Sequence, residues 1–147
     1  MFGGLRIATS AMTAQRISMD VSAQNIANAE TTHTAEGGPY QRRIAELEAV
    51  LPGAASGAMG GFGHYALQAS ADVTGGVRIA GIRTDRSPGP MIYDPGNPDA
   101  DRNGYVRMPN VDMVEEMMAF KESGDAFQAN ATLFQAISSM LRKAVKI

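Results

Sequence analysis

The chain has 147 residues, of which 44% are hydrophobic, 19% are charged and 6% are aromatic, and its formal net charge is -2. This size fits one ordinary domain or one compact unit with extended arms. The charge excludes the overall basic field that favours nucleic acid or an anionic membrane. The absence of cysteine excludes disulfides, zinc–thiolate sites and cysteine nucleophiles. No apolar run approaches the ~20 residues that span a bilayer, so direct membrane insertion is not expected.

The first zone, residues 1–34, has the spacing of an amphipathic helix. Large apolar residues recur every seven positions, at Leu5, Met12, Met19 and Ile26. The intervening positions are small or polar, at Ala8, Gln15 and Ser22. This a/d pattern predicts a helix that another helix approaches closely. Polar residues interrupt the apolar ones, so we expect a cytoplasmic protein or one exported without a cleaved signal peptide.

The middle zone, residues 35–107, holds six of the seven prolines and predicts turns and short strands. Within it, the Gly- and Ala-rich stretch 53–71 is interpreted as a loop or an insertion. Short strands are expected at 77–80, 91–93 and 105–107, with a candidate bulge at Gly81. Residues 44–51 fit a helix face and a strand face equally, so both readings stay open.

The third zone, residues 108–147, repeats the alternating four-and-three spacing of the first. Its apolar stripe includes Met113, Met117, Phe120, Phe127, Phe134 and Leu141. Asp112 and Glu115 resemble a capping box at the start of this helix, and Gly124 is a candidate kink. The predicted fold is therefore mainly α with a small β region. Long terminal helices pair as an antiparallel coiled coil, and a β-hairpin and loop-rich segment joins them.

Few residues suggest a chemical site. Residues 99–104 match the first six positions of a calcium loop, but the twelfth position is Asn110 instead of Glu. An ordinary Asx/Gly turn is the favoured interpretation, and a weak cation site is the alternative. The two histidines, His33 and His64, lack metal-ligand spacing. With no nucleophile elbow or phosphate loop, the sequence predicts no catalytic, cofactor or metal site.

The end of the first helix has two interpretations. Asn25 and Asn28 are three residues apart and therefore share a helix face. They either satisfy free backbone groups at the helix end, or make a contact that fixes the helix pair or a neighbouring subunit.

Several segments resemble a known family. The segment 25–32, Asn-Ile-Ala-Asn-Ala-Glu-Thr-Thr, resembles the signature of the flagellar rod, hook and hook-associated proteins. A more specific likeness to the FlgC family is carried by segments 37–43, 93–101, 104–106, 109–111, 115–117 and 127–130. The resemblance fails over 53–70, and Asn97 stands where the family pattern has His.

This resemblance implies a structural subunit of the proximal rod in the bacterial flagellar basal body. Such a subunit leaves through the flagellar type III export apparatus without a cleaved signal. It polymerises with copies of itself and other rod proteins into a shaft that crosses the periplasm and transmits motor torque to the hook. The resemblance implies no nucleic-acid partner and no enzyme activity.

The expected contacts between helices or subunits are made by thirteen residues. These are Leu5, Met12, Met19, Asn25, Ile26, Asn28, Met113, Met117, Phe120, Phe127, Asn130, Phe134 and Leu141. The alternative function is a coiled-coil adaptor or export-linked interaction protein that does not polymerise. An enzyme with a site in the middle zone is the remaining, least favoured class.

Overall fold

The computed structural model describes residues 2–50 and 75–145. Within these ranges the chain forms two long helices and two small antiparallel hairpins, which agrees with the predicted mainly α fold with a small β region. The predicted insertion 53–71 lies outside the described residues. No helix in the described part is both long and apolar enough to cross a membrane. The elements are α1 (Phe2–Ala27), β1 (Arg43–Val50), β2 (Gly76–Thr84), β3 (Met91–Tyr93), β4 (Tyr105–Arg107) and α2 (Met113–Val145).

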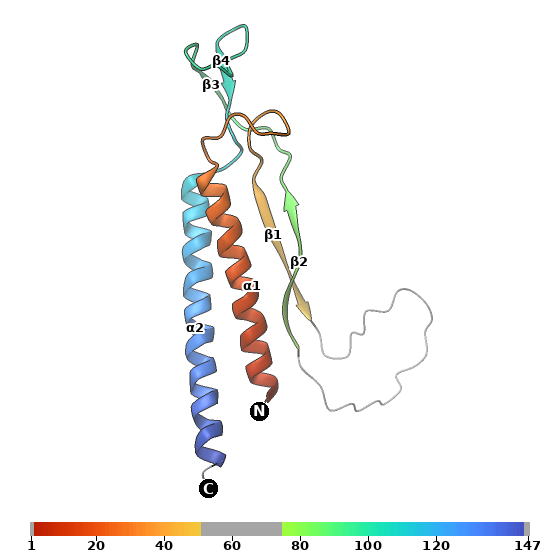
Figure 1. Cartoon of the computed structure of the whole chain (residues 1–147), viewed down its shortest axis with the longest axis vertical. Coiled ribbons are helices and arrows are strands. Elements are labelled where there is room, and N and C mark those ends of the chain that lie inside the picture. The colour runs from red at the N-terminus through yellow and green to blue at the C-terminus, as the bar shows by residue number, and fades with distance from the viewer. Residues whose placement is uncertain (1, 51–74, 146–147) are drawn as a thin grey trace, which may run out of the picture.

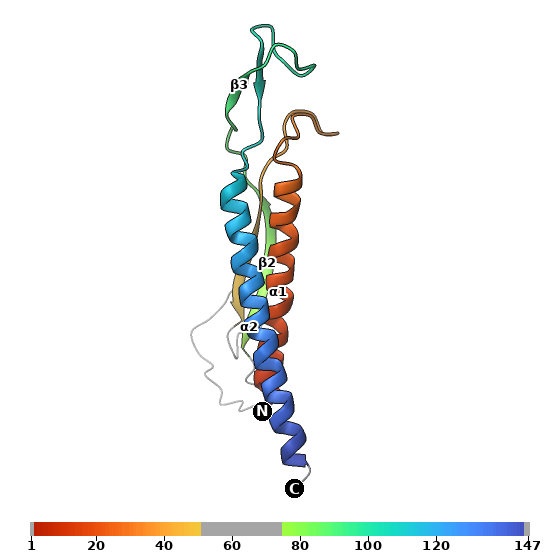
Figure 2. The same cartoon turned by 90° about the vertical axis from the view of Figure 1, so that its left-hand side faces the viewer.

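The two helices lie side by side and run antiparallel along the length of the molecule (Figures 1 and 2). Their mutual contact is the most extensive between any two elements, and α1 also contacts both β1 and β2. The β1–β2 hairpin lies beside α1, whereas the β3–β4 hairpin projects beyond the far end of the helix pair (Figure 1). With 33 residues against 26, α2 extends past the start of α1 (Figure 1).

Small side chains dominate the buried face of α1. Its buried residues are Ala8, Ala14, Val21, Ser22 and Asn25. The predicted large positions of the heptad pattern, Leu5, Met12, Met19 and Ile26, are only half-buried. Ala8 and Ser22 are small positions of the predicted pattern, and the buried arc also includes residues outside it, as expected for a helix that contacts both α2 and the hairpin.

The pattern of residues 44–51 fits a helix and a strand equally. The structure shows a strand, because residues 44–50 belong to β1. Glu48 pairs with Arg78 across the hairpin at 2.8 Å, and Glu46 pairs with Arg83 at 2.8 Å. The register shifts between Glu46, opposite Gly81, and Leu47, opposite Ile79. The bulge predicted at Gly81 is therefore confirmed, with one extra residue on β2.

The third predicted zone contains one unbroken helix. Asp112 caps α2, because its Oδ1 accepts hydrogen bonds from the backbone N–H groups of Val114 (2.9 Å) and Glu115 (3.2 Å). In a capping box the side chain of Glu115 would bond the backbone N–H of Asp112. Here it accepts a hydrogen bond from Arg42. The candidate kink position, Gly124, lies within the continuous helix, where a Cβ atom would be 3.7 Å from the Sδ of Met19. That distance is an ordinary van der Waals contact, so α1 lies close to α2 here but leaves room for a methyl group.

Candidate functional site

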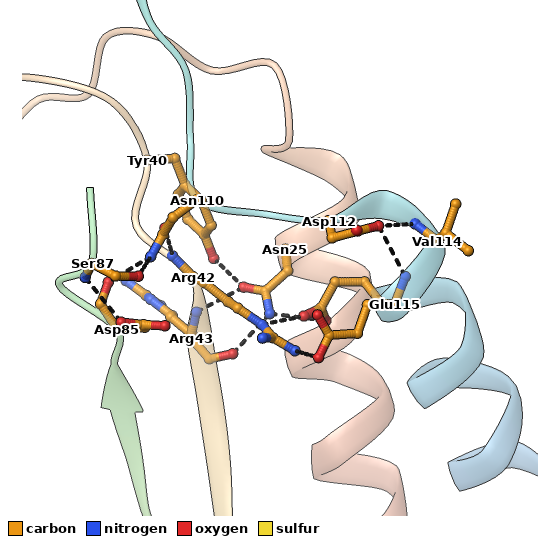
Figure 3. Close-up of polar contacts among 11 residues, drawn as sticks. Asn25, Tyr40, Arg42, Arg43, Asp85, Ser87, Asn110, Asp112, Val114 and Glu115 are labelled. Atoms are coloured by element: carbon orange, nitrogen blue, oxygen red, sulfur yellow. Dashed lines mark hydrogen bonds and ion pairs between the residues drawn. The ribbon is translucent and has the colours of Figure 1, made fainter. Parts of the chain in front are cut away.

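A cluster of polar side chains joins the end of α1, the start of β1 and the start of α2 (Figure 3). We call this cluster the polar junction. It comprises Asn25, Tyr40, Arg42, Arg43, Asn110 and Glu116. Two of its side chains are almost completely buried: Asn25 is 1% exposed and Glu116 is 2% exposed. Burial of polar groups is unfavourable unless each finds a partner, so the partners decide what the cluster can do.

Asn25 uses the full hydrogen-bonding capacity of its amide. Its Nδ2 donates to the carbonyl oxygen of Arg43 (2.8 Å) and to Oε2 of Glu116 (3.0 Å). Its Oδ1 accepts from the backbone N–H of Arg43 (2.9 Å) and from the hydroxyl of Tyr40 (2.9 Å). One α1 side chain therefore holds both backbone groups of a β1 residue and a carboxylate of α2.

Glu116 is held from two sides. Its Oε1 accepts a hydrogen bond from Nε of Arg42 at 2.6 Å, and its Oε2 accepts the one from Asn25. Arg42 also donates from Nη2 to Oε1 of the more exposed Glu115 at 3.1 Å. Although burial alone would lower the pKa of Arg42, the hydrogen bonds and charges of Glu116 and Glu115 raise it. Burial also raises the pKa of Tyr40, with Arg43 opposing and Glu116 adding to the effect.

Asn110 extends the junction to the segment that follows β2 (Figure 3). Its Oδ1 accepts from the backbone N–H of Arg42 at 2.8 Å. Its Nδ2 donates to the carbonyl oxygen of Asp85 and to the hydroxyl of Ser87, both at 3.0 Å. The hydrogen bonds from Ser87 lower the pKa of Asp85. Four stretches of chain that are distant in sequence are thus fixed at one place.

The two asparagines at the end of α1 have different surroundings. Asn25 joins the helix to other elements, whereas Asn28 makes local contacts. Nδ2 of Asn28 donates to the carbonyl oxygen of Gln24 at 2.8 Å, and its Oδ1 accepts from the hydroxyl of Thr31 at 3.3 Å. Asn130 of α2 is also local, because it donates to the carbonyl oxygen of Ala126 at 2.9 Å. Asn25 therefore makes a contact between the two helices. Asn28 bonds a backbone group at the helix end.

Several apolar side chains of α2 are exposed in the single chain. Among the predicted contact residues, Met113, Met117, Phe120 and Phe134 are exposed, while Phe127 and Leu141 are half-buried. Four further residues of α2 share this exposure and were not among the predicted contacts. We call the whole exposed set the α2 apolar surface: Met113, Val114, Met117, Met118, Phe120, Leu133, Phe134 and Met140.

The β3–β4 hairpin and its turn, residues 91–107, form a second exposed apolar region, which we call the tip. Met91, Ile92, Tyr93 and Tyr105 are exposed there. The rings of Tyr93 and Tyr105 meet edge to face, with centroids 5.3 Å apart. The hydroxyl of Thr32 donates to Oδ2 of Asp99 at 2.7 Å and ties the tip to the segment after α1.

The calcium-like segment of the tip is built as a series of Asx turns. Oδ1 of Asp101 accepts hydrogen bonds from the backbone N–H groups of Asn103 (2.7 Å) and Tyr105 (3.0 Å). Oδ1 of Asn97 accepts one from the backbone N–H of Asp99. Gly104 has a φ of 80°, which glycine adopts without strain. The loop's own amides thus occupy these oxygens, and the described residues contain no cluster of three metal-ligating side chains.

Sequence reasoning missed Arg42, Tyr40 and the burial of Glu116. One signal was present for Glu116, which follows Met113 by three residues and precedes Phe120 by four. It therefore lies on the apolar stripe, where a charged residue needs a buried partner. Arg42 and Tyr40 lie outside any periodic segment, so spacing does not point to them, although segment 37–43 is part of the family likeness.

Comparison with known proteins gives the family. Residues 5–32 match the family described as "Flagella basal body rod protein", and residues 102–147 match "Flagellar basal body rod FlgEFG protein C-terminal". The chain is 37% identical to the flagellar basal-body rod protein FlgC of Borreliella burgdorferi, covering 100% of this chain and 97% of that protein.

The FlgC protein of Bacillus subtilis is 35% identical, over 99% of this chain and 97% of its own length. That of Escherichia coli is 35% identical, over 96% and 92%. These alignments include the polar junction, the tip and both helices. The chain therefore belongs to the FlgC family of flagellar basal-body rod proteins, which are structural subunits and not enzymes.

Proposed function

We propose that this chain polymerises, with copies of itself and with other rod proteins, into the proximal part of the flagellar rod. The observation that carries the proposal is the α2 apolar surface, whose eight side chains are between 37% and 68% exposed. Large exposed apolar patches on a protein surface typically mark a site of contact with another protein. Complete burial of a fully exposed side chain of this size contributes about 1.5–3 kcal/mol, and the exposed part of each of these residues is what a neighbour could still cover. Neighbouring subunits that cover this surface would therefore supply a strong drive for assembly.

The placement of the apolar regions favours an open assembly. The tip and the C-terminal part of α2 lie at opposite ends of the elongated chain (Figure 1). Contacts between different surfaces of successive subunits do not close on themselves unless the rotation forms a ring, so they extend into a helical tube. Four methionines on α2 provide side chains that adapt to non-identical neighbours: Met113, Met117, Met118 and Met140.

The helix pair supports a coiled-coil arrangement within each subunit. The two helices lie close together at two glycines, and the closer approach is at Gly4. A Cβ atom at Gly4 would lie 3.3 Å from Cδ1 of Ile137, and one at Gly124 would lie 3.7 Å from Sδ of Met19. Together with the seven-residue spacing of α1, this favours an antiparallel coiled coil as the unit that stacks in the rod.

Family membership supports a proposal for where the protein acts and how it gets there. We propose that the subunit passes through the flagellar type III export apparatus without a cleaved signal peptide and joins the rod where it crosses the periplasm. As part of this shaft it would transmit motor torque to the hook. The support is the likeness to FlgC proteins over nearly the whole chain.

Purified basal bodies test the proposal directly. A strain that lacks this chain is complemented with the unchanged protein or with Met117→Asp and Met118→Asp combined. We expect the unchanged chain in the rod fraction, and loss of the variant from that fraction and of swimming. Gln128→Asp, at an exposed polar position of the same helix, is the matched control and should behave as the unchanged chain. A complete rod without this chain would favour the non-polymerising adaptor instead.

A further inference from the structure

The buried part of the polar junction has a consequence for how the two helices align. We infer that Glu116, held between Asn25 and Arg42, fixes the register in which α2 pairs with α1. This inference deepens the proposed function. The biological role of the register rests on that function, because the register decides where the α2 apolar surface meets a neighbouring subunit. Its physical basis lies in the contacts of the single chain.

Three contacts along the helix pair define one antiparallel register. Gly4 faces Ile137 near the start of α1, and Met19 faces Gly124 in the middle. At the end of α1, Asn25 donates a hydrogen bond to Glu116. The first two contacts are apolar and the third is polar. Apolar and polar contacts differ in how strongly they select one register.

The Met19–Gly124 contact recurs every seven residues and therefore does not single out one register. Gly124 is followed at the same spacing by Ala131 and Ser138, all small. Met19 is preceded at that spacing by Met12. A slip of one heptad replaces a Met–Gly contact with another contact between a Met and a small residue. Packing of this kind is nearly degenerate in alignment.

The polar contact does not recur. Seven residues beyond Glu116 stands Ser123, and seven before Asn25 stands Ser18. A slip of one turn moves Glu116 by about 5.4 Å, which is beyond hydrogen-bond distance of both Asn25 and Arg42. The carboxylate of Glu116 would then lose both of its partners, and Nδ2 of Asn25 would lose one. Separating a buried charge from its partners is strongly unfavourable.

The groups that receive Glu116 belong to a frame that does not slide with α2. Asn25 is part of α1 and holds both backbone groups of Arg43. Arg42, the preceding residue, has its carbonyl oxygen bonded to the backbone N–H of Asp85, just after β2, at 2.8 Å. Because Asn25 and Arg42 bind different oxygens of Glu116, the carboxylate also fixes the rotation of α2 about its axis. In this rotation Met117 and Met118 are exposed.

A buried polar residue at one position of a helix pair is known to specify alignment even where apolar substitution is neutral or stabilising. The polar junction therefore functions chiefly in positioning. The contacts at the glycines bring the two helices close together. Glu116 selects one of several possible alignments of α2 along α1.

Disulfide trapping in the purified full chain tests the inference, because the natural sequence has no cysteine. Met19→Cys with Gly124→Cys reports the observed register, and Met19→Cys with Ala131→Cys reports a slip of one heptad. The decisive change exchanges two residues of α2, Glu116→Ser with Ser123→Glu, and keeps the composition constant. We expect the ratio of slipped to native cross-link to rise at least about tenfold, because the buried carboxylate now finds its partners only after the slip. Glu115→Ser, which removes a more exposed carboxylate of the same turn, should leave the ratio unchanged.

A second variant covers the case in which the exchange variant loses its helical circular dichroism. Glu116→Leu with Arg42→Met removes the charged pair together, and should yield both cross-links in one folded population. The native cross-link alone, in whichever of the two variants is folded, would overturn the inference. The measurement involves no other rod protein. Absence of the unchanged chain from purified rods would therefore contradict the proposed function and leave the register result standing.

Discussion

The contrast between Asn25 and Asn28 gives a sharp quantitative prediction. Asn25→Ala removes four hydrogen bonds at once, and leaves Glu116 and both backbone groups of Arg43 with one partner fewer. Each buried polar group left unsatisfied costs about 1–3 kcal/mol. Water that reaches the partly buried groups of Arg43 and Tyr40 would offset part of this cost. We expect a loss of roughly 3–5 kcal/mol, a large share of the ~5–15 kcal/mol stability of an ordinary domain.

Asn28→Ala is the matched control for this prediction. It makes the same chemical change three residues along the same helix, where the amide donates to Gln24 and accepts from Thr31. Because water replaces such partly exposed partners, its cost should stay below about 1 kcal/mol. Urea unfolding followed by circular dichroism at the helix band measures both variants. Equal destabilisation within about 0.5 kcal/mol would refute the view that Asn25 is the centre of the junction.

Three further predictions concern other parts of the molecule. Met117→Asp with Met118→Asp should change the unfolding free energy of the free chain by less than about 1 kcal/mol, since both side chains are exposed; a large loss would show that the surface is part of the subunit's own core. Gly124→Ala should stabilise the chain by about 0.5–1 kcal/mol through helix propensity, because its Cβ atom meets only Met19 at 3.7 Å. Gly124→Leu should destabilise it by forcing the helices apart, and equal melting temperatures for the two variants would contradict the close approach. Burial raises the pKa of Tyr40 above its ordinary value of 10.0, so the folded chain retains that proton more firmly than the unfolded chain, and stability should fall as pH rises above about 10. Tyr40→Phe should reduce this alkaline loss in urea titrations between pH 7 and 11, and an unchanged pH profile would disprove the effect.

Much of the fold could be predicted because its signals are periodic. The heptad spacing of Leu5, Met12 and Met19 predicts α1, and the stripe from Met113 predicts α2. The helix α1 ends at Ala27, before the expected limit of the first zone, because the chain turns there with Asn28 capping the carbonyl of Gln24. Local periodicity thus predicts the type of element more reliably than its last residue.

Other features depend on contacts between distant residues and leave no periodic trace. The pattern of residues 44–51 fits a helix as well as a strand, and only the pairing of β1 with β2, more than 20 residues further along the chain, decides for the strand. The partner of Glu116 is likewise an arginine 74 positions away. The apolar stripe of α2 was predicted correctly as a pattern, but spacing alone does not tell whether the same chain or a neighbour covers it.

The central claim is that the α2 apolar surface and the tip are contacts between subunits of the rod. A density map of the intact basal body, at a resolution that shows side chains, tests this claim most directly. We predict this chain in the proximal rod, with Met117, Met118 and Tyr93 buried against neighbouring subunits and Glu116 still bonded to Asn25. A proximal rod in which these three side chains face solvent, or which contains no copy of this chain, would contradict the account.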